Sequence, residues 1–320
     1  MTHHRVLIVG GGPAGAACAW KLVQAGVDCL ILDKQTFPRS KICAGWITPK
    51  VFQDLQINPL DYPHSLTSFS SLLIYINGIP IIRPGRQFAI RRTEWDDWLL
   101  KRSGVRIKNH EVKEIVKVEK GWRVDDQFFA DILVGAGGTH CPVYRSIYKQ
   151  SHPRSGEQIV ALEEEFPIDW LDNKCRLWFF DHGLPGYAWY VPKVGGYLNI
   201  GVGGNSSVLK KRGSSIQEHW GYLVEKLQNK GLVPDREFHP EGYVYYLRGS
   251  QDLVQSGNVF LIGDSCGLAT LDMGEGIGPA VQSGLLAAEA ILGEKEYSPA
   301  GIQRFSLLPN FLRWVVPQKT

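Results

Sequence analysis

The sequence predicts an α/β fold in which a doubly wound layer is interrupted by an inserted, mainly antiparallel sheet. Residues 5–9, 13–25 and 28–32 follow a βαβ pattern of apolar strand, alanine-rich helix and apolar strand. Short aromatic and β-branched segments, typical of antiparallel strands, begin near residue 70. An apolar strand at 258–264 and a helix at 279–293 return to the first pattern near the end of the chain.

The segments between these landmarks follow in order. Residues 71–76 and 87–90 are predicted strands, residues 93–104 a helix, and residues 128–138 an apolar strand that ends in glycines. Further strands are expected at 158–166, 176–180, 187–191, 197–202 and 243–247. Because the inserted strands split the doubly wound pattern, the first domain is expected to be discontinuous, with residues 1–65, 92–153 and 250–320. The inserted domain then comprises residues 66–91 and 154–249.

The composition is that of an ordinary globular protein, with 44% hydrophobic and 21% charged residues among 320. A net charge of +3 and a longest basic run at 210–212 argue against a nucleic-acid partner. The six cysteines form no CxxC pair and no metal-type His/Cys spacing, so we expect free thiols, no metal and a reducing compartment. No signal peptide or membrane-spanning stretch is visible, and a cytoplasmic protein is expected.

A glycine motif, G-x-G-x-x-G, joins the first strand to its helix, which is the context in which it indicates dinucleotide binding. Gly10 permits a tight turn, Gly12 lets a pyrophosphate approach, and Gly15 lets the helix pack on the strand. The helix N-terminus offers N–H donors to phosphate, and Asp33 at the end of the second strand offers a carboxylate to the ribose hydroxyls. The alternative is a glycine-rich turn that binds no ligand.

A second glycine-rich stretch, LIGDSCGLATLDMGEGIG at residues 261–278, indicates that the expected cofactor is FAD rather than NAD. It resembles the segment by which FAD enzymes hold the ribityl chain, in which Gly263 precedes an Asp264 that accepts a ribityl hydroxyl. Gly274 and Gly276 would let backbone lie against the isoalloxazine ring, and the next helix would aim its N-terminus at the N1/O2 edge. The alternative is that these glycines form only a strand-to-helix loop.

Five motifs in order resemble the geranylgeranyl reductase family of FAD-dependent oxidoreductases, which shares the p-hydroxybenzoate hydroxylase fold. The resemblance implies a Rossmann-like FAD-binding domain of the glutathione-reductase type, formed by the discontinuous first domain, and a β-sheet substrate domain formed by the insertion. The implied cofactor is FAD, with NAD(P)H or a reduced protein as electron donor. The motifs are RVLIVGGGPAGAACAW, FPRSKICAGW, FAIRRTEWDDWL, GYAWYVPK with YLNIGVGG, and GDSCGLATLDMGEGIGPAVQSGLLAAEAI.

The resemblance also implies individual site residues. The loop at 37–46 would lie beside the flavin ring, with Ala44 in place of the family's usual glycine. There the Cys43 thiol would position substrate or supply a proton, and the alternative is a small buried hydrophobic side chain. Tyr187 and Trp189 would line the substrate cavity, or else belong to ordinary sheet core. The expected cofactor-binding residues are Gly10, Gly12, Pro13, Ala14, Gly15, Asp33, Lys34, Arg39, Lys41, Cys43, Ala44, Arg92, Val112, Gly263, Asp264, Gly274, Gly276 and Ile277.

The leading functional hypothesis is reduction of a carbon–carbon double bond in an apolar, isoprenoid-like or polycyclic substrate. An FAD-dependent monooxygenase of a small aromatic or polycyclic compound is the first alternative, although Gly267 and Leu271 replace residues typical of hydroxylases. A flavin-binding redox partner without turnover is the second. Halogenation is disfavoured because flavin halogenases need a lysine after the first βαβ unit to capture hypohalous acid, and residues 51–100 contain no lysine. The C-terminal FLRWVVPQKT is a candidate peripheral membrane contact, and the alternative is a tucked-in core segment, since Pro309 lies just before it. In the first case a partner or membrane surface would complete the substrate cavity, and in the second the substrate would be smaller.

Overall fold

The computed structural model describes residues 1–169, 172–249 and 254–307, and the chain divides into two compact units. The first unit comprises Met1–Arg39, Thr93–Glu157 and Tyr246–Thr320, and the second comprises Ser40–Arg92 and Gln158–Tyr245. We had expected residues 40–65 in the first domain. They group with the second unit because strand β3 (Trp46–Ile47) pairs with β5 and helix α2 (Pro49–Asp54) packs on β5.

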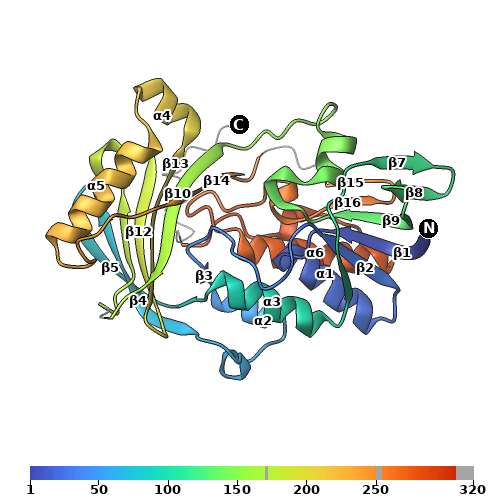
Figure 1. The fold of residues 1–320 in the computed structure, drawn as a ribbon, viewed down its shortest axis with the longest axis horizontal. Helices are drawn as coiled ribbons and strands as arrows, with labels where there is room; N and C mark the ends of the chain where they lie inside the picture. Colours follow the sequence, from blue (N-terminus) through green and yellow to red (C-terminus); the bar gives the residue numbers. More distant parts are fainter. Residues whose placement is uncertain (170–171, 250–253, 308–320) are drawn as a thin grey trace. The chain divides into compact units, whose positions relative to one another are not determined.

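The first unit is built on a largely parallel sheet with the order β15-β16-β9-β1-β2-β6 (Figure 1). Strands β2 and β9 flank β1 in parallel register, so the expected βαβ unit forms the centre of the sheet. Buried aliphatic residues of β1, β2, β9 and β16 form its core. The strands are β1 (Thr2–Val9), β2 (Cys29–Asp33), β6 (Arg106–Asn109), β9 (Phe128–Gly135), β15 (Gln255–Ser256) and β16 (Val259–Leu261), with a hairpin of β7 (Ile115–Val118) and β8 (Gly121–Val124) pairing with β9.

Two helices of the first unit, α1 (Pro13–Gln24) and α6 (Ile277–Ile291), pack against each other at very short range. A Cβ atom at Gly284 would lie 2.3 Å from the backbone oxygen of Ala14 and 3.1 Å from the backbone nitrogen of Cys18. The glycine therefore permits a backbone-to-backbone contact that no larger residue allows. Helix α3 (Arg92–Ser103) matches the helix predicted at 93–104.

The second unit is built on a mostly antiparallel sheet with the order β14-β10-β13-β12-β11-β4-β5-β3 (Figure 1). Its β11 and β4 pair in parallel, and the other registered pairs are antiparallel. The sequence predicted strands at most of these places but missed the two helices that follow β13. The elements are β4 (Thr67–Ile76), β5 (Ile79–Ala89), β10 (Gln158–Pro167), β11 (Arg176–Phe179), β12 (Gly186–Lys193), β13 (Tyr197–Asn205), β14 (Glu241–Tyr246), α4 (Ser206–Arg212) and α5 (Ile216–Asn229).

The two faces of this second sheet contact different parts of the unit. One face packs against α5 through a large apolar cluster that includes Tyr190, Ile200, Trp220 and Leu223. Register places Tyr187 and Trp189 on the other face, because Trp189 lies opposite Gly201 and Tyr187 opposite Gly203. The alternation along β12 therefore sends Tyr190 into the core and leaves Tyr187 and Trp189 to a separate surface.

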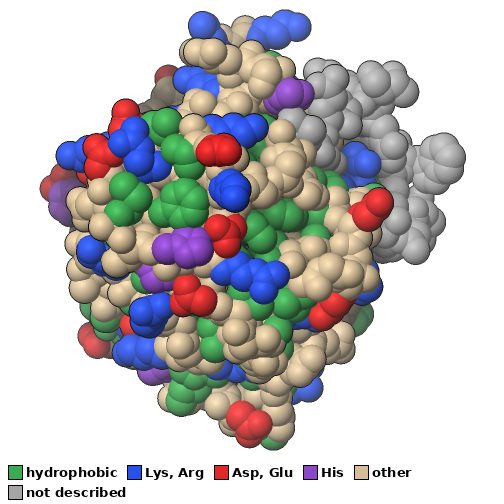
Figure 2. All heavy atoms as spheres, turned by 90° about the vertical axis from the view of Figure 1, so that its right-hand side faces the viewer, with side chains coloured by type: hydrophobic (Ala, Val, Ile, Leu, Met, Phe, Trp, Pro, Cys, Tyr) green, Lys and Arg blue, Asp and Glu red, His purple; other side chains and the backbone are tan. Residues whose placement is uncertain are grey.

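The described surface agrees with the modest net charge. Figure 2 shows basic and acidic side chains interspersed on the face turned toward the viewer. In the described part of the chain, no helix combines the length and the apolar character needed to cross a bilayer. Residues 308–320, which include the segment expected to contact a membrane or partner, lie outside the described residues.

We expect Gly284→Ala to lower the free energy of unfolding by about 1–3 kcal/mol, because the new methyl group would overlap the backbone of α1. Gly221→Ala is the matched control, since Gly221 is an exposed interior glycine of α5 with nothing within 4 Å of its Cβ position. That control should gain up to about 1 kcal/mol from helix propensity. Urea denaturation followed by circular dichroism measures both, and equal stability of the two variants would contradict the close helix contact.

Candidate active site

The first glycine turn contains two glycines that the fold itself requires. Gly10 has φ +115°, and a Cβ there would lie 2.3 Å from the backbone oxygen of Ala136 at the end of the neighbouring strand β9. A Cβ at Gly15 would lie 2.0 Å from the backbone oxygen of Gly10. Both positions are therefore explained by strand–strand and helix–strand packing, without reference to a ligand.

Gly12 is different because nothing in the fold requires a glycine there. Its backbone is extended, with φ −71° and ψ −174°, and the contact that a Cβ there would make among the described residues, its chain neighbours aside, is an ordinary one with Nη2 of Arg39 at 3.5 Å. Helix α1 begins directly after it with no side-chain cap and no acidic residue in its first turn. Free N–H groups and open space beside Gly12 make a site for an anion.

The Arg39 guanidinium supplies a positive charge beside this turn. Its Nη2 lies 3.4 Å from a carboxylate oxygen of Asp96, and its Cζ lies 4.8 Å from the ring centroid of Phe37. Within the described residues its Nε is buried without a hydrogen-bond partner. The sequence motif assigned Arg39 to the loop expected beside the flavin ring, and in the structure its guanidinium lies beside the Gly12 turn.

Asp33 is held in place at the end of β2. Its Oδ2 accepts a hydrogen bond from the backbone N–H of Gly11 at 2.7 Å, and its Oδ1 accepts one from the N–H of Gln35 at 2.9 Å. The neighbouring Lys34 is exposed, and Val112 is buried in the core of this unit after β6. The carboxylate of Asp33 is thus fixed beside the glycine turn, where it can accept further bonds from hydroxyl groups.

The second glycine-rich stretch converges on the first, although about 250 residues separate them in the sequence. Gly263 has φ +61°, and its Cβ position lies 3.1 Å from Cβ of Ala14 at the start of α1 and 3.3 Å from Cβ of Ala280 in α6. The carboxylate of Asp264 faces the second bend, because Oδ1 lies 3.2 Å from the Cβ position of Gly276. The short contact between α1 and α6 therefore brings both bare-backbone turns to one place.

Glu275, which the sequence analysis did not single out, occupies the N-terminus of α6. Its Oε1 accepts a hydrogen bond from the N–H of Gly278 at 2.6 Å, and its own N–H donates to Oγ1 of Thr270. Burial raises the pKa of its carboxyl group to about 7, although the N–H of Gly278 acts to lower it. The N-terminus of the helix that we expected to face the flavin therefore also carries this carboxyl group.

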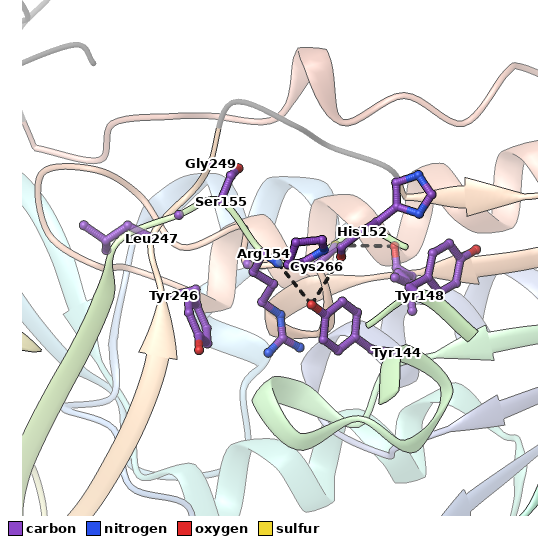
Figure 3. A pocket seen from close by; sticks show the side chains of 13 residues that line it. Tyr144, Tyr148, His152, Arg154, Ser155, Tyr246, Leu247, Gly249 and Cys266 are labelled. Carbon is purple, nitrogen blue, oxygen red and sulfur yellow. Dashed lines mark hydrogen bonds between the residues drawn. The ribbon is translucent and has the colours of Figure 1, made fainter. Parts of the chain in front are cut away.

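A pocket in the first unit is lined by Tyr144, Arg154, Tyr246 and, from the glycine-rich turn, Cys266 and Gly267, among others (Figure 3). Arg154 donates hydrogen bonds to the backbone oxygens of Thr139 at 2.8 Å and Ser265 at 2.9 Å. Its guanidinium also lies 3.9 Å from the ring centroid of Tyr144. Arg154 thus fastens the turn that carries Asp264, a role that no sequence motif indicated.

In the second unit, the loop that carries Cys43 is attached to β10. The backbone N–H of Cys43 donates to the carboxylate of Glu163, and the N–H of Gly45 donates to the Cys43 thiol at 3.4 Å. Gly45 has φ +69°, and its Cβ position lies 2.1 Å from the backbone oxygen of Ile90. The half-buried Ala44 lies between these two fixed points.

Two further predicted residues lie in the second unit. The Lys41 ammonium lies 3.1 Å from the ring centroid of Tyr243, which is a cation–π contact. Arg92 is buried at the start of α3. The structure thus brings Cys43 and its loop to the sheet face that also carries Trp189, because Glu163, Gly201 and Trp189 are cross-strand neighbours on that face.

The residues present fit FAD. Gly12 keeps its turn free of a side chain, Arg39 offers a buried Nε–H that has no partner in the described part of the chain, and the Asp33 and Asp264 carboxylates lie in the same unit beside the two turns. One end of this arrangement suits a pyrophosphate with its ribose and the other a second hydroxylated chain. These features define an FAD-dependent oxidoreductase with a Rossmann-like nucleotide-binding domain.

Comparisons with known proteins support the assignment to FAD-dependent oxidoreductases. Residues 8–66 match the family described as NAD(P)-binding Rossmann-like domain. An uncharacterized protein of Methanosarcina barkeri is 32% identical over 308 residues, covering 91% of this chain and 75% of that protein. The menaquinone reductase of Mycobacterium tuberculosis is 27% identical over 309 residues (89% and 76%). Digeranylgeranylglycerophospholipid reductase 3 of Methanosphaera stadtmanae is 26% identical over 329 residues (94% and 81%).

A solved structure has the same fold. The geranylgeranyl bacteriochlorophyll reductase-like protein of Thermoplasma acidophilum superposes with a TM-score of 0.77 at 19% identity, over 94% of this chain and 81% of that one. The chain belongs to the geranylgeranyl reductase family of FAD-dependent oxidoreductases, as the sequence motifs predicted.

We expect Gly12→Ala to weaken FAD binding at least tenfold, while the free energy of unfolding of the FAD-free protein changes by less than about 0.5 kcal/mol. The new methyl group makes only an ordinary contact with Arg39 in the fold, but it would occupy the place that we assign to the pyrophosphate. Titration of the FAD-free protein with FAD, followed by flavin fluorescence, gives the dissociation constant. An unchanged dissociation constant would contradict the assignment of this turn to the phosphates.

Gly10→Ala serves as the contrasting variant. Because Gly10 has a left-handed φ and a Cβ position 2.3 Å from a backbone oxygen, this change should destabilise the FAD-free protein itself. The two variants together separate the glycine that the fold needs from the glycine that the ligand needs.

Proposed function

We propose that this flavoenzyme reduces a carbon–carbon double bond in an apolar substrate, either an isoprenoid-like chain or a polycyclic compound. The observation that carries the proposal is that the Cys43 loop and the aromatic residues Tyr187 and Trp189 share one face of one sheet. The names of the menaquinone and digeranylgeranylglycerophospholipid reductases among its relatives support the same class of reaction.

The aromatic face is continuous. The rings of Phe179 and Tyr187 stack with centroids 5.0 Å apart, and the Tyr187 and Trp189 centroids are 5.7 Å apart. Leu177, opposite Trp189 on β11, and Ile74 of β4 continue the same face. Such a run of rings and aliphatic side chains suits an apolar ligand and offers it few hydrogen bonds.

Trp189 is fixed on this face by two contacts. Its Nε1 donates a hydrogen bond to Oδ1 of Asn199 at 2.7 Å. Its ring lies directly against the bare backbone of Gly201, where a Cβ would be only 2.2 Å from Cζ2. We infer that the indole ring is a rigid wall for the substrate, since both its edge and its face are held.

Reduced FAD supplies the hydride for such a reaction, so the protein's task is to seat the cofactor, orient the alkene and exclude water. In the proposed arrangement Gly12 and Arg39 hold the pyrophosphate, Asp33 the ribose and Asp264 the ribityl chain. NAD(P)H or a reduced protein would reduce the flavin.

The test is anaerobic. The FAD-loaded protein is reduced with dithionite and mixed with geranylgeraniol, with a polycyclic alkene, or with the fully saturated alcohol as control. We expect one of the alkenes, and not the saturated alcohol, to restore the absorbance of oxidised flavin, with a product two hydrogens heavier by mass spectrometry. A reduced protein that no alkene reoxidises would contradict the proposal.

The same preparation distinguishes the alternatives. Substrate-stimulated NAD(P)H oxidation that consumes oxygen and yields hydrogen peroxide or a hydroxylated product would identify a monooxygenase. A protein that binds FAD but is reoxidised by neither alkenes nor oxygen with substrate would be a redox partner without turnover.

We expect Gly201→Ala to raise the KM for the alkene about tenfold, equivalent to about 1.4 kcal/mol, because the added methyl group displaces the Trp189 ring. Gly203→Ala is the matched control on the same strand, since its Cβ position lies 3.5 Å from Trp189, an ordinary contact. Steady-state kinetics measure KM, and FAD binding should be unchanged in both variants. Equal KM values would contradict the role of Trp189.

A further inference from the structure

Hydride transfer to an alkene leaves one carbon that still needs a proton. This inference rests on the proposed function and asks which side chain supplies that proton. The aromatic face of the second unit carries an unusual set of buried ionisable groups next to Trp189. Glu163 of β10 and Lys193 of β12 are buried, and Glu165 of β10, which is bonded to Arg91, is half-buried.

Glu165 has no proton to give. Its carboxylate forms ion pairs with the buried Lys193 ammonium and, at 2.8 Å, with Nε of Arg91. Burial acts to raise its pKa, but Lys193 and Arg91 together hold the pKa of Glu165 below its ordinary value. The two cations therefore balance the negative charge of Glu165, and its side chain remains ionised.

Glu163 is in a different state although it lies only two residues away on the same face. The groups that face it are the Cys43 N–H, the Asn199 amide, Lys193 and Glu165. None of them forms an ion pair with it among the described salt bridges, since Lys193 is bonded to Glu165. Burial raises the pKa of Glu163 to about 7, although Lys193 and the Cys43 N–H act to lower it.

The position of Glu163 joins the loop to the aromatic wall. Glu163 lies opposite Gly201, and Gly201 lies opposite Trp189, so the three residues form one row across β10, β13 and β12. Because Gly201 has no side chain, the Trp189 ring extends over it along this row. The carboxyl group of Glu163 is thus placed between the Cys43 backbone and the surface proposed to hold the alkene.

We propose that Glu163 is the acid that protonates the substrate. The O–H bond of its carboxyl group breaks and the proton forms a C–H bond with the alkene carbon that does not receive the hydride. The alkene gains a hydride and a proton, the reduced cofactor loses two electrons, and Glu163 is left as a carboxylate. A proton from water then restores the acid before the next turnover.

The wild-type enzyme gives the first test, through the pH dependence of alkene-driven reoxidation of the anaerobically reduced protein. Because the acid must be protonated, the rate should be constant well below pH 7 and fall about tenfold per pH unit above it. A rate that is flat or rises from pH 6 to pH 8.5 would overturn the proposal without any variant.

Glu163→Gln is the second test, because the amide oxygen can still accept the Cys43 N–H but the side chain has no acidic proton. We expect the reoxidation rate to fall at least about 100-fold and to lose its dependence on pH near 7, with FAD binding and dithionite reduction unchanged. Glu164→Gln is the control, since Glu164 points to the opposite face, where it bonds Arg236 and His239. A Glu163→Gln rate within threefold of wild type would overturn the proposal.

Two further readouts do not depend on how well Glu163→Gln turns over. Glu163→Ala should regain activity with added imidazole below pH 7, where its cationic form can donate a proton, which a purely structural role would not produce. In the FAD-free protein, the infrared C=O band of protonated carboxyl groups should titrate near pH 7, and Glu163→Gln should remove one component. Glu275→Gln should remove another component, since Glu275 is also a buried carboxyl group whose pKa burial raises to about 7. Absence of the Glu163 component would contradict the proposal.

The outcomes separate this inference from the function on which it rests. A wild-type enzyme that no alkene reoxidises contradicts the reductase function, and the role of Glu163 falls with it. If the wild-type enzyme turns over and Glu163→Gln turns over at a similar rate, only the role of Glu163 is contradicted. The Cys43 thiol then becomes the acid to test.

Discussion

The backbone contact between α1 and α6 is the constraint on which the nucleotide-binding unit depends. Gly284 allows the two helix backbones to approach until a side chain no longer fits between them. Both helices begin at glycine-rich turns, α1 after Gly12 and α6 after Gly276, so this contact fixes the two turns relative to each other. A ligand with a phosphate at one end and a ribityl chain near the other needs that fixed separation, because rigid positioning lowers the entropic cost of binding.

The glycines of the first turn show how structural need and ligand need can be separated. Gly10 and Gly15 sit where any Cβ would overlap backbone atoms, so the fold alone explains them. Gly12 has ordinary backbone angles and only an ordinary contact with Arg39 at its Cβ position, so the fold alone does not explain it. The sequence motif treats the three as one signature, and only the coordinates show that the fold itself requires two of them.

Much of this arrangement could be predicted from the sequence, for identifiable reasons. The βαβ unit, the two glycine turns and the alternating strands depend on local pattern, and the structure has them where the pattern put them. Glu163 could not be predicted, because three glutamates in a row, as in QIVALEEEF, suggest a strand exposed to solvent. Only the pairing of β10 with β13 shows that neighbouring glutamates face opposite sides of the sheet, both of which are covered by other parts of the chain. Arg154 and helices α4 and α5 were missed because their roles depend on partners distant in the sequence.

The domain boundary shows the same limit. Residues 40–65 follow the first βαβ unit directly, and composition gave no reason to separate them from it. Pairing of Trp46 and Ile47 with the end of β5 attaches them to the other sheet. The Cys43 loop therefore belongs to the unit that carries the aromatic face, and its backbone is bonded to Glu163 of that unit.

Buried carboxyl groups are costly for a fold, and this cost is itself informative. A glutamate whose pKa rises from 4.5 in the unfolded chain to about 7 in the folded protein favours folding only while it is protonated; once it ionises, burial disfavours the folded state. That contribution is complete below pH 4.5 and is lost as the pH rises to 7, which amounts to about 3 kcal/mol for each group. Glutamine would occupy nearly the same volume in either site without this loss. The chain nevertheless places one such group beside Cys43 and Trp189 in the second unit and another at the N-terminus of α6 in the first. Buried groups with strongly shifted pKa values are more common at functional sites than elsewhere in a fold, which is why the cost of keeping them points to a use.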